Sequence, residues 1–252
     1  MKVLFIGDIY GEPGREMVKK FLPILKDEHK PNIIIVNGEN SADNGRGIKE
    51  TYYKELMKLG VNAVTMGNHV WGQKELVNFI DEANILRPAN YLSAPGKKHL
   101  VLNFNGKKLL VINLLGRTFM DANLENPFVT AKNILEKEDY DYSIIDFHAE
   151  ATSEKIAFAH YLDGLASAIV GTHTHVQTAD DRLLPKGTLY LTDVGMTGPL
   201  NGIIGVSKEI VINRFLNGYT TPNKVEVGLK QLNAVVLNLE SKEIKRIHIE
   251  SE

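Results

Sequence analysis

Potential metal ligands recur along this chain, and most of them come directly after a short apolar run. Carboxylate, amide and imidazole groups together suit iron, manganese, zinc or cobalt, whereas magnesium prefers a shell of oxygen atoms alone. Because open α/β sheets place their sites at the carboxyl ends of their strands, we expect these side chains to lie close together. The candidate metal ligands are Asp8, Glu39, Asn40, Asn68, His148, His173 and His175.

Two short motifs carry the strongest signal for a metal site. In Gly67-Asn68-His69 the glycine allows a sharp turn after an apolar run, which exposes two side chains at the sheet edge. In Gly171-Thr172-His173-Thr174-His175 the two imidazoles stand at positions i and i+2. They point to opposite sides of an extended segment, and in a tight loop they can reach two different ions. The pair therefore favours a dinuclear site.

Each of these residues taken alone has a simpler interpretation. Asp8 after a strand is more often a helix-capping carboxylate, Glu39 a solvated acid in a loop, and His148 a histidine of the core or surface. Their occurrence in one series with the two motifs is what indicates a site. The other histidines are expected to have no part in it: His29, His99, His160 and His248.

Composition restricts the class of protein. The chain has 252 residues and no cysteine, which excludes disulfides, thiolate catalysis and cysteine-bound metal. Its 29 lysines and arginines nearly balance its 31 aspartates and glutamates, so a general basic surface for nucleic acid is not expected. No apolar stretch reaches the ~18 residues of a membrane span, and the N-terminal apolar run is too short for a signal peptide. We expect a cytoplasmic protein with no membrane partner.

Short apolar runs rich in β-branched residues alternate with amphipathic stretches, a pattern typical of an α/β fold with buried central strands. Short links join Leu100–Phe104 to Leu109–Leu115 and Ala234–Leu239 to Ile244–Ile249. Each pair is expected to form an antiparallel hairpin, so mixed sheets are expected. No linker or repeat divides the sequence, and residues 1–252 should form a single domain. The expected strands are Val3–Ile6, Ile33–Val36, Ala63–Met66, Leu100–Phe104, Leu109–Leu115, Ser143–Phe147, Ala168–Val170, Leu189–Thr192, Ala234–Leu239 and Ile244–Ile249.

Apolar spacing of three and four residues predicts helices between these runs. Pro127 suits the first turn of a helix over Pro127–Lys137, and Thr152-Ser153-Glu154 supplies capping residues for another. The apolar faces of three more helices are Met17, Phe21, Leu22 and Leu25; Tyr52, Leu56 and Leu59; and Leu76, Phe79, Ile80 and Ala83.

The series of motifs resembles that of the calcineurin-like metallophosphoesterases, which runs Asp-x-His, Gly-Asp, Gly-Asn-His-(Asp/Glu), His and Gly-His-x-His. The sequence is most similar to the bacterial YmdB-like branch, in which the second motif is Gly-Glu-Asn. The resemblance covers nearly the whole chain and implies a four-layer α/β/β/α sandwich with two mixed β-sheets. The segments that carry it are Gly38-Glu39-Asn40-Ser41-Ala42, Gly67-Asn68-His69-Val70-Trp71, Gly171-Thr172-His173-Thr174-His175-Val176-Gln177 and Thr192-Asp193-Val194-Gly195-Met196-Thr197-Gly198-Pro199.

The resemblance also implies a role for each candidate residue. His69 would bind no metal and would act as the general acid. The implied reaction is hydrolysis of 2′,3′-cyclic nucleotides to 3′-nucleotides by a hydroxide that bridges two metal ions. Iron or manganese are expected first, with zinc, cobalt or magnesium as alternatives. Glu39 would bridge the two ions, one completed by Asp8, Asn40 and His175 and the other by Asn68, His148 and His173.

Two positions depart from the wider superfamily. Tyr10 stands where Asp-x-His has its histidine, and the amide oxygen of Asn40 is expected to replace the missing ligand. Val70 stands where a carboxylate usually follows Gly-Asn-His, which leaves the group that orients His69 unidentified. The segment Leu200-Asn201-Gly202 is also less polar than expected after Gly-Pro.

Substrate contacts are less clearly indicated by the sequence. Arg46 and Arg117 follow strand-like runs and could bind phosphate, although solvated loop arginines are more frequent. Core packing is the favoured interpretation of the aromatic residues that could stack on a base, which are Trp71, Tyr91, Phe119 and Phe128.

Other functions stay open from the sequence alone. The same metals could serve a phosphomonoesterase or a ribonuclease-like enzyme acting on RNA. A metal-loaded regulatory module that binds a nucleotide and a protein partner is another hypothesis, although such a binder would not need His69. A dinucleotide-binding fold is disfavoured, because residues 7–14 lack the Gly-x-Gly-x-x-Gly spacing. A homo-oligomer is the default expectation.

Overall fold

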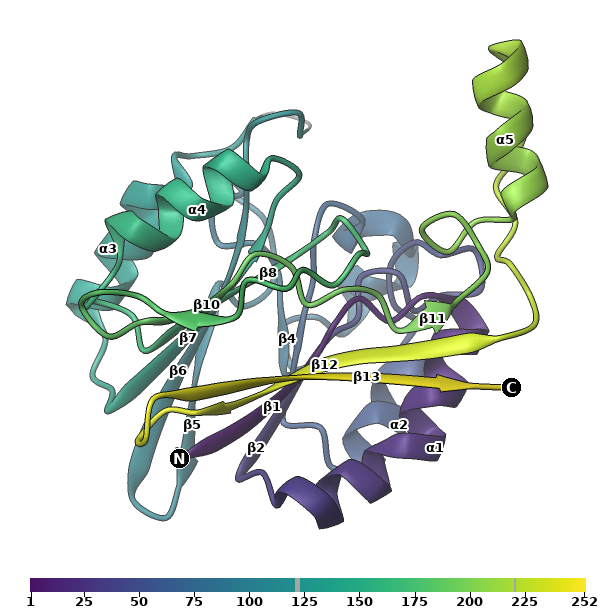
Figure 1. Cartoon of the computed structure of the whole chain (residues 1–252). Helices are drawn as coiled ribbons and strands as arrows, with labels where there is room; N and C mark the ends of the chain where they lie inside the picture. The colour runs from purple at the N-terminus through teal and green to yellow at the C-terminus, as the bar shows by residue number, and fades with distance from the viewer. Residues whose placement is uncertain (121–122, 220) are drawn as a thin grey trace.

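The computed structural model describes residues 1–120, 123–219 and 221–252, and it contains two β-sheets packed face to face between layers of helices (Figure 1). The first sheet has seven strands: β1 (Lys2–Ile6), β2 (Ile33–Asn37), β3 (Ala63–Thr65), β4 (Ile85–Leu86), β11 (Gly198–Pro199), β12 (Lys230–Asn238) and β13 (Glu243–Ser251). Their order is β11-β12-β1-β2-β3-β4, with β13 paired to β12. Strands β1 to β4 are parallel, and β12 runs antiparallel to β1.

The second sheet has six strands: β5 (His99–Phe104), β6 (Lys107–Leu115), β7 (Tyr142–His148), β8 (Ala168–Thr172), β9 (Arg182–Leu183) and β10 (Leu189–Leu191). Their order is β5-β6-β7-β8-β10-β9, in which the four inner strands are parallel and both edge strands are antiparallel. Both sheets are therefore mixed. The predicted hairpins are confirmed as the antiparallel pairs β5–β6 and β12–β13.

Helices cover the outer faces of the two sheets (Figure 1). The covering helices are α1 (Gly11–His29), α2 (Glu50–Lys58), α3 (Pro127–Lys137) and α4 (Thr152–Tyr161). The described residues also form α5 (Lys208–Asn217) and the 3₁₀ turns η1 (Val70–Gly72) and η2 (Lys74–Asn78). Helix α3 begins as predicted, because Pro127 lies in its first turn and Asn126 accepts the backbone N–H of Phe128. Helix α5, which the sequence analysis did not identify, projects away from the sheets (Figure 1).

Two details of the predicted helices are wrong. The segment Leu76–Ala83 begins inside the 3₁₀ turn η2 and continues in further turns, not in an α-helix. Its apolar spacing requires only that the side chains reach the core, and these turns still bury Leu76 and Ile80 completely. The N-cap residue of α4 is Ala151, whose side chain makes no cap hydrogen bond. Glu154 instead accepts backbone N–H groups of the loop that follows β6.

Alternate residues of the central strands face different layers, as the pleat of a strand requires. In β1, Val3 and Phe5 belong to the apolar cluster between the two sheets. Leu4 and Ile6 belong to a second cluster, which the first sheet forms with α1 and α2. A third cluster joins the other sheet to α3 and α4. The predicted four-layer α/β/β/α sandwich is therefore confirmed.

The parallel strands determine where polar side chains meet. Strands β1, β2 and β3 of one sheet and β7 and β8 of the other end at the same edge of the sandwich, which is where ligands bind in α/β sheets. The helices of the described part of the chain include none that is long and apolar enough to cross a bilayer.

Candidate active site

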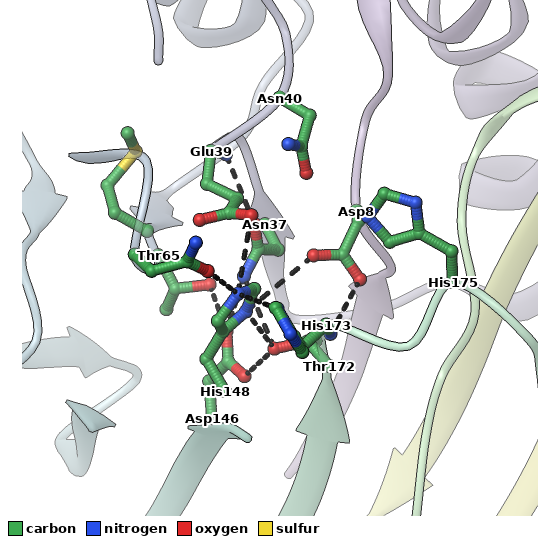
Figure 2. A network of polar contacts seen from close by, with 12 residues as sticks. Asp8, Asn37, Glu39, Asn40, Thr65, Asp146, His148, Thr172, His173 and His175 are labelled. Carbon is green, nitrogen blue, oxygen red and sulfur yellow. Dashed lines mark hydrogen bonds and ion pairs between the residues drawn. The ribbon is translucent and has the colours of Figure 1, made fainter. Parts of the chain in front are cut away.

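Polar side chains from both sheets converge beyond these strand ends (Figure 2). The first sheet supplies the residues after β1, β2 and β3, and the second supplies the end of β7 and the loop after β8. The structure therefore brings together all the predicted metal ligands and His69. They are Asp8 after β1, Glu39 and Asn40 after β2, Asn68 and His69 after β3, His148 at the end of β7, and His173 and His175 after β8.

One group of potential ligands surrounds the Nε2 atom of His148. Glu39, His148 and His173 each place a ligand atom within 4.8 Å of the others. His148 Nε2 lies 3.0 Å from His173 Nδ1, 3.3 Å from Glu39 Oε1 and 3.0 Å from the amide oxygen of Asn68. These four residues are the set expected at one ion, with Glu39 as its bridging member.

A second group shares Glu39 with the first. Asp8, Glu39 and His175 also place ligand atoms within 4.8 Å of one another, and all three residues are buried. Among the described residues, Asp8 Oδ1 and Asn40 Oδ1 are buried oxygens without a hydrogen-bond partner. Such orphaned acceptors are costly unless a cation or another partner satisfies them. These oxygens and the imidazole of His175 therefore fit the ligand shell of a metal ion at this position.

The outer nitrogen of each ligand histidine has its own acceptor, which leaves the inner nitrogen free for a metal. His148 Nδ1 lies 2.8 Å from the hydroxyl of Thr172, which in turn donates to Asp146 Oδ1 at 2.7 Å (Figure 2). Asp146 is fully buried and also accepts hydrogen bonds from Asn37 and Thr65. Such support fixes the tautomer of a metal-binding histidine.

The two histidines of the loop after β8 are held in the same way. His173 Nε2 lies 3.1 Å from a carboxylate oxygen of Glu150. His175 Nδ1 lies 2.9 Å from the carbonyl oxygen of Ile204. Both histidines have left-handed backbones, with φ of 101° and 67°. This loop conformation turns their imidazoles toward different ligand groups, as the i, i+2 spacing predicted.

The carboxylates of the site are not neutralised by lysine or arginine. Among the described residues, the ion pairs of Asp8 and Glu39 involve histidines only. Burial raises the pKa of Asp8 well above its usual value. Burial acts the same way on Glu39, but the charges and hydrogen bonds of His148 and His69 prevail and hold its pKa well below the usual range. The site therefore attracts cations.

The histidines respond to this charge in opposite directions. Burial opposes the cationic form of His148, but the facing carboxylates of Glu39 and Asp8 outweigh it and raise its pKa to about 9. Burial and repulsion from His148 lower the pKa of His173 to about 3. A proton on His148 thus provides positive charge where the geometry fits a metal ion.

His69 stands beside the ligands with a third of its side chain exposed. Its backbone N–H donates to Glu39 Oε2 at 3.0 Å, and its Nδ1 lies 3.0 Å from the amide nitrogen of Asn40 and 3.3 Å from Glu39 Oε1. Glu39 and Asn40 therefore orient the His69 ring. Val70, which stands where the wider superfamily has a carboxylate, is buried in the core. Tyr10, which stands where the wider superfamily has a ligand histidine, packs its ring edge-on against His175 with the ring centroids 5.6 Å apart.

A pocket of about 370 Å³ opens onto both ligand groups. Arg46 lines it, whereas Arg117 does not. The aromatic residues proposed as base-stacking candidates also lie outside its lining. Trp71 packs edge-on against Tyr91 and Phe128 against Phe158, while Phe119 is 88% exposed.

Sequence reasoning missed four residues that support the ligands, and the signals for them differ. Asp146 and Thr172 are polar residues at the ends of apolar strands, which is a detectable sign of a buried polar role. Glu150 lies two residues after His148 but looks like an ordinary loop acid. Ile204 acts through its carbonyl oxygen, which no side-chain pattern could indicate. His99 and His248 contact Glu138 and Asn233 instead of the site.

Comparison with known proteins places the chain in a family. A family profile described as "YmdB-like protein" matches residues 4–251. The 2′,3′-cyclic-nucleotide 2′-phosphodiesterase of Bacillus subtilis (strain 168) is 50% identical over 254 residues, which cover 99% of this chain and 96% of that protein. A crystal structure of a "novel phosphatase" from Mycoplasma pneumoniae has 40% identity and a TM-score of 0.91, with 100% and 93% of the two chains covered.

A more distant structure, the 5′-nucleotidase of Candida albicans, has a TM-score of 0.59 at 14% identity. The match covers 99% of this chain and 51% of that one, and it indicates a shared fold. The matched profile and the half-identical relative both extend along nearly the entire sequence. This protein therefore belongs to the YmdB-like family of calcineurin-like metallophosphoesterases.

Proposed function

We propose that this protein is a metal-dependent phosphodiesterase that hydrolyses 2′,3′-cyclic nucleotides to 3′-nucleotides. The observation that carries the proposal is the pair of ligand groups that share Glu39 and lie beside His69. The name of the Bacillus subtilis relative, which is half identical along the whole chain, supplies the substrate class and the bond that breaks.

Two metal ions would bind to the two groups. Glu39 would contact both ions, and iron or manganese suits a mixed imidazole and oxygen shell better than magnesium does. When bound, the ions would polarise the phosphoryl oxygen and activate water as the nucleophile. The expected ligands are Asp8, Asn40 and His175 at one ion, and Asn68, His148 and His173 at the other.

His69 is the proposed general acid. Its Nδ1 is held by Asn40 and Glu39, so the opposite nitrogen, Nε2, is the one available to protonate the leaving 2′ oxygen. Protonation matters because a sugar alkoxide is a poor leaving group, and a positioned acid accelerates such steps by roughly 10²–10⁴-fold. The side chain lines the pocket and is partly exposed, as a proton donor must be.

The test is turnover of 2′,3′-cyclic AMP by protein loaded with manganese or iron, with the product identified. We expect 3′-AMP, and we expect Glu39→Gln to abolish its formation and to lower the metal content. Formation of 2′-AMP would contradict the assigned bond. A protein that holds two ions per chain and leaves the cyclic nucleotide intact would contradict the substrate.

A phosphomonoesterase is the second candidate, because the Mycoplasma pneumoniae structure is named a phosphatase. The same assay separates the two functions. A phosphomonoesterase would convert 3′-AMP onward to adenosine, whereas a diesterase would let 3′-AMP accumulate. RNA as substrate, a regulatory binding role, a homo-oligomeric state, a single domain and a cytoplasmic location stay expectations from the sequence.

A further inference from the structure

The pocket over the ligand groups has one strongly basic side chain in its wall. Its described lining includes the acids Glu39 and Glu150 and the histidines His69, His173 and His175, and the lysines and arginines contribute only Arg46. A phosphate diester carries a negative charge, so a fixed cation at this wall would complement it. The structure therefore raises the question of whether Arg46 is positioned or merely solvated.

The loop that carries Arg46 has a fixed backbone. Gly45 and Gly47 flank it with left-handed φ of 71° and 77°. A Cβ at Gly45 would lie 2.7 Å from the ring of Tyr10, and one at Gly47 would lie 2.8 Å from the backbone nitrogen of Gln73. Both glycines are needed for this close approach, which clamps the loop between Tyr10 and the segment after η1.

Hydrogen bonds fix the main chain of Arg46 itself. Its N–H donates to Asn44 Oδ1 at 3.1 Å, and its carbonyl oxygen accepts from Gln73 Nε2 at 2.8 Å. A Cβ at Gly72 would lie only 2.8 Å from its carbonyl carbon. The point from which the side chain starts is therefore held from three sides.

The guanidinium of Arg46, in contrast, has no hydrogen bond or ion pair with any residue in the described ranges. The nearest acid along the loop, Asp43, is already used. It accepts Arg15 Nη2 at 2.9 Å, Lys49 Nζ at 2.8 Å and the hydroxyl of Tyr52 at 2.8 Å. The neighbouring cations are thus neutralised within the protein, and Arg46 keeps its charge free for a ligand.

The loop that carries Arg46 packs at Gly45 against Tyr10, whose side chain lines the same pocket and meets the ring of His175 edge-on. Arg46 therefore lies on the same pocket wall as the candidate metal ligands.

We infer that Arg46 is a substrate-binding residue whose guanidinium donates hydrogen bonds to a non-bridging oxygen of the phosphate. The inference rests on the proposed phosphodiesterase function for its substrate, and on the pocket for its geometry. It assigns to Arg46 a contact with the phosphate in addition to the metal ions, which the ligand side chains cannot supply because with metal bound they are carboxylates, amides and neutral imidazoles.

The test compares Arg46→Met with Arg46→Lys and with Arg117→Met in metal-loaded protein. Hydrogen bonds to charged groups contribute enough for a KM increase of roughly 10- to 100-fold in Arg46→Met, with a smaller change in kcat. Arg46→Lys keeps the charge but loses the planar fork, so it should recover part of the affinity. Arg117 is also an exposed loop arginine but lies outside the pocket lining, and Arg117→Met should match the wild type.

Binding of inorganic phosphate, measured by calorimetry on the same proteins, separates this inference from the proposed function. The wild type could show no turnover and yet bind phosphate more tightly than Arg46→Met does. That result would overturn the proposed diesterase function and support the role of Arg46 in binding phosphate. Equal KM and equal phosphate affinity in the wild type and Arg46→Met, at equal metal content, would overturn the inference. So would a wild-type protein that binds neither phosphate nor the cyclic nucleotide.

Discussion

At the scale of single residues, the site depends on which nitrogen of each histidine is free. Acceptors at Thr172, Glu150 and the carbonyl of Ile204 take the outer nitrogens of the three ligand histidines. His69 differs, because Asn40 and Glu39 contact its Nδ1 and its side chain lines the pocket. The proposed roles follow from this difference: three histidines would bind metal, and His69 would transfer a proton.

This difference predicts the behaviour of His69→Ala. The variant should keep its full metal content, because no ligand is removed, and should lose roughly 10²–10⁴-fold in kcat. Metal analysis and steady-state kinetics on the same preparation check both statements. His69→Gln serves as a control, since it restores a polar side chain without a titratable proton and should stay equally slow. Loss of metal together with turnover would show that His69 is a ligand.

A second residue-scale prediction concerns the proton on His148. Its pKa of about 9 lies above the ordinary value, so the ring is cationic at pH 7.5 in the metal-free protein and becomes neutral only as the pH passes about 9. A metal ion at Nε2 requires the neutral ring, so binding must release a proton and apparent affinity should rise from pH 6 to pH 9. Calorimetry in buffers of different ionisation enthalpy measures this release. Binding heat at pH 7.5 that is independent of the buffer would contradict it.

At the scale of elements, a buried ion pair holds the loop after β8. Lys155 of α4 donates to Asp193 Oδ2 at 2.7 Å and to the carbonyl of Thr172 at 2.8 Å. The same Asp193 oxygen accepts the backbone N–H of Thr174 at 3.1 Å. The pair therefore holds the loop by hydrogen bonds to Thr172 and Thr174, on either side of His173, whose backbone is left-handed.

Breaking this pair should separate stability from metal binding. Lys155→Met leaves Asp193 buried and uncompensated, which costs about 3–5 kcal/mol. The double variant Lys155→Met/Asp193→Leu should recover most of that stability, because apolar replacements of buried pairs are tolerated. It should still bind metal more weakly, since Thr174 has lost its acceptor. Urea unfolding and metal titration check the two variants. A double variant with full stability and unchanged metal affinity would show that the pair only fills the core.

The elements also show what the sequence can and cannot predict. The central strands were predictable because their apolar runs are buried on both faces, and the meeting of the candidate ligands because they lie at the ends of such runs. The turns at Leu76–Ala83 were not, since helical and 3₁₀ backbones bury the same apolar spacing. Helix α5 was missed because it projects from the sheets, with Phe215 85% exposed and only Val211 buried, in a small apolar cluster away from the main core. The contact from Ile204 involves only its backbone.

At the scale of the whole molecule, the two ligand groups connect the two sheets. Glu39 comes from the first sheet and belongs to both groups, while His148, His173 and His175 come from the second. The apolar cluster between the sheets holds them together without metal, because it is formed by buried residues of both. Metal ions would add cross-links at the edge where the buried carboxylates otherwise repel one another.

Metal loading should therefore stabilise the whole fold and not only the site. An ion present at 100 times its Kd adds about 2.7 kcal/mol to the free energy of unfolding. In a protein of this size that corresponds to a rise in Tm of roughly 5–10 °C per site. Calorimetry of chelator-treated protein, before and after manganese is returned, measures the shift. Because Glu39 belongs to both groups, Glu39→Gln should lose most of it, whereas Arg117→Met should keep it. An equal shift in Glu39→Gln would show that the stabilising ions bind elsewhere and that the sheets are not joined through this site.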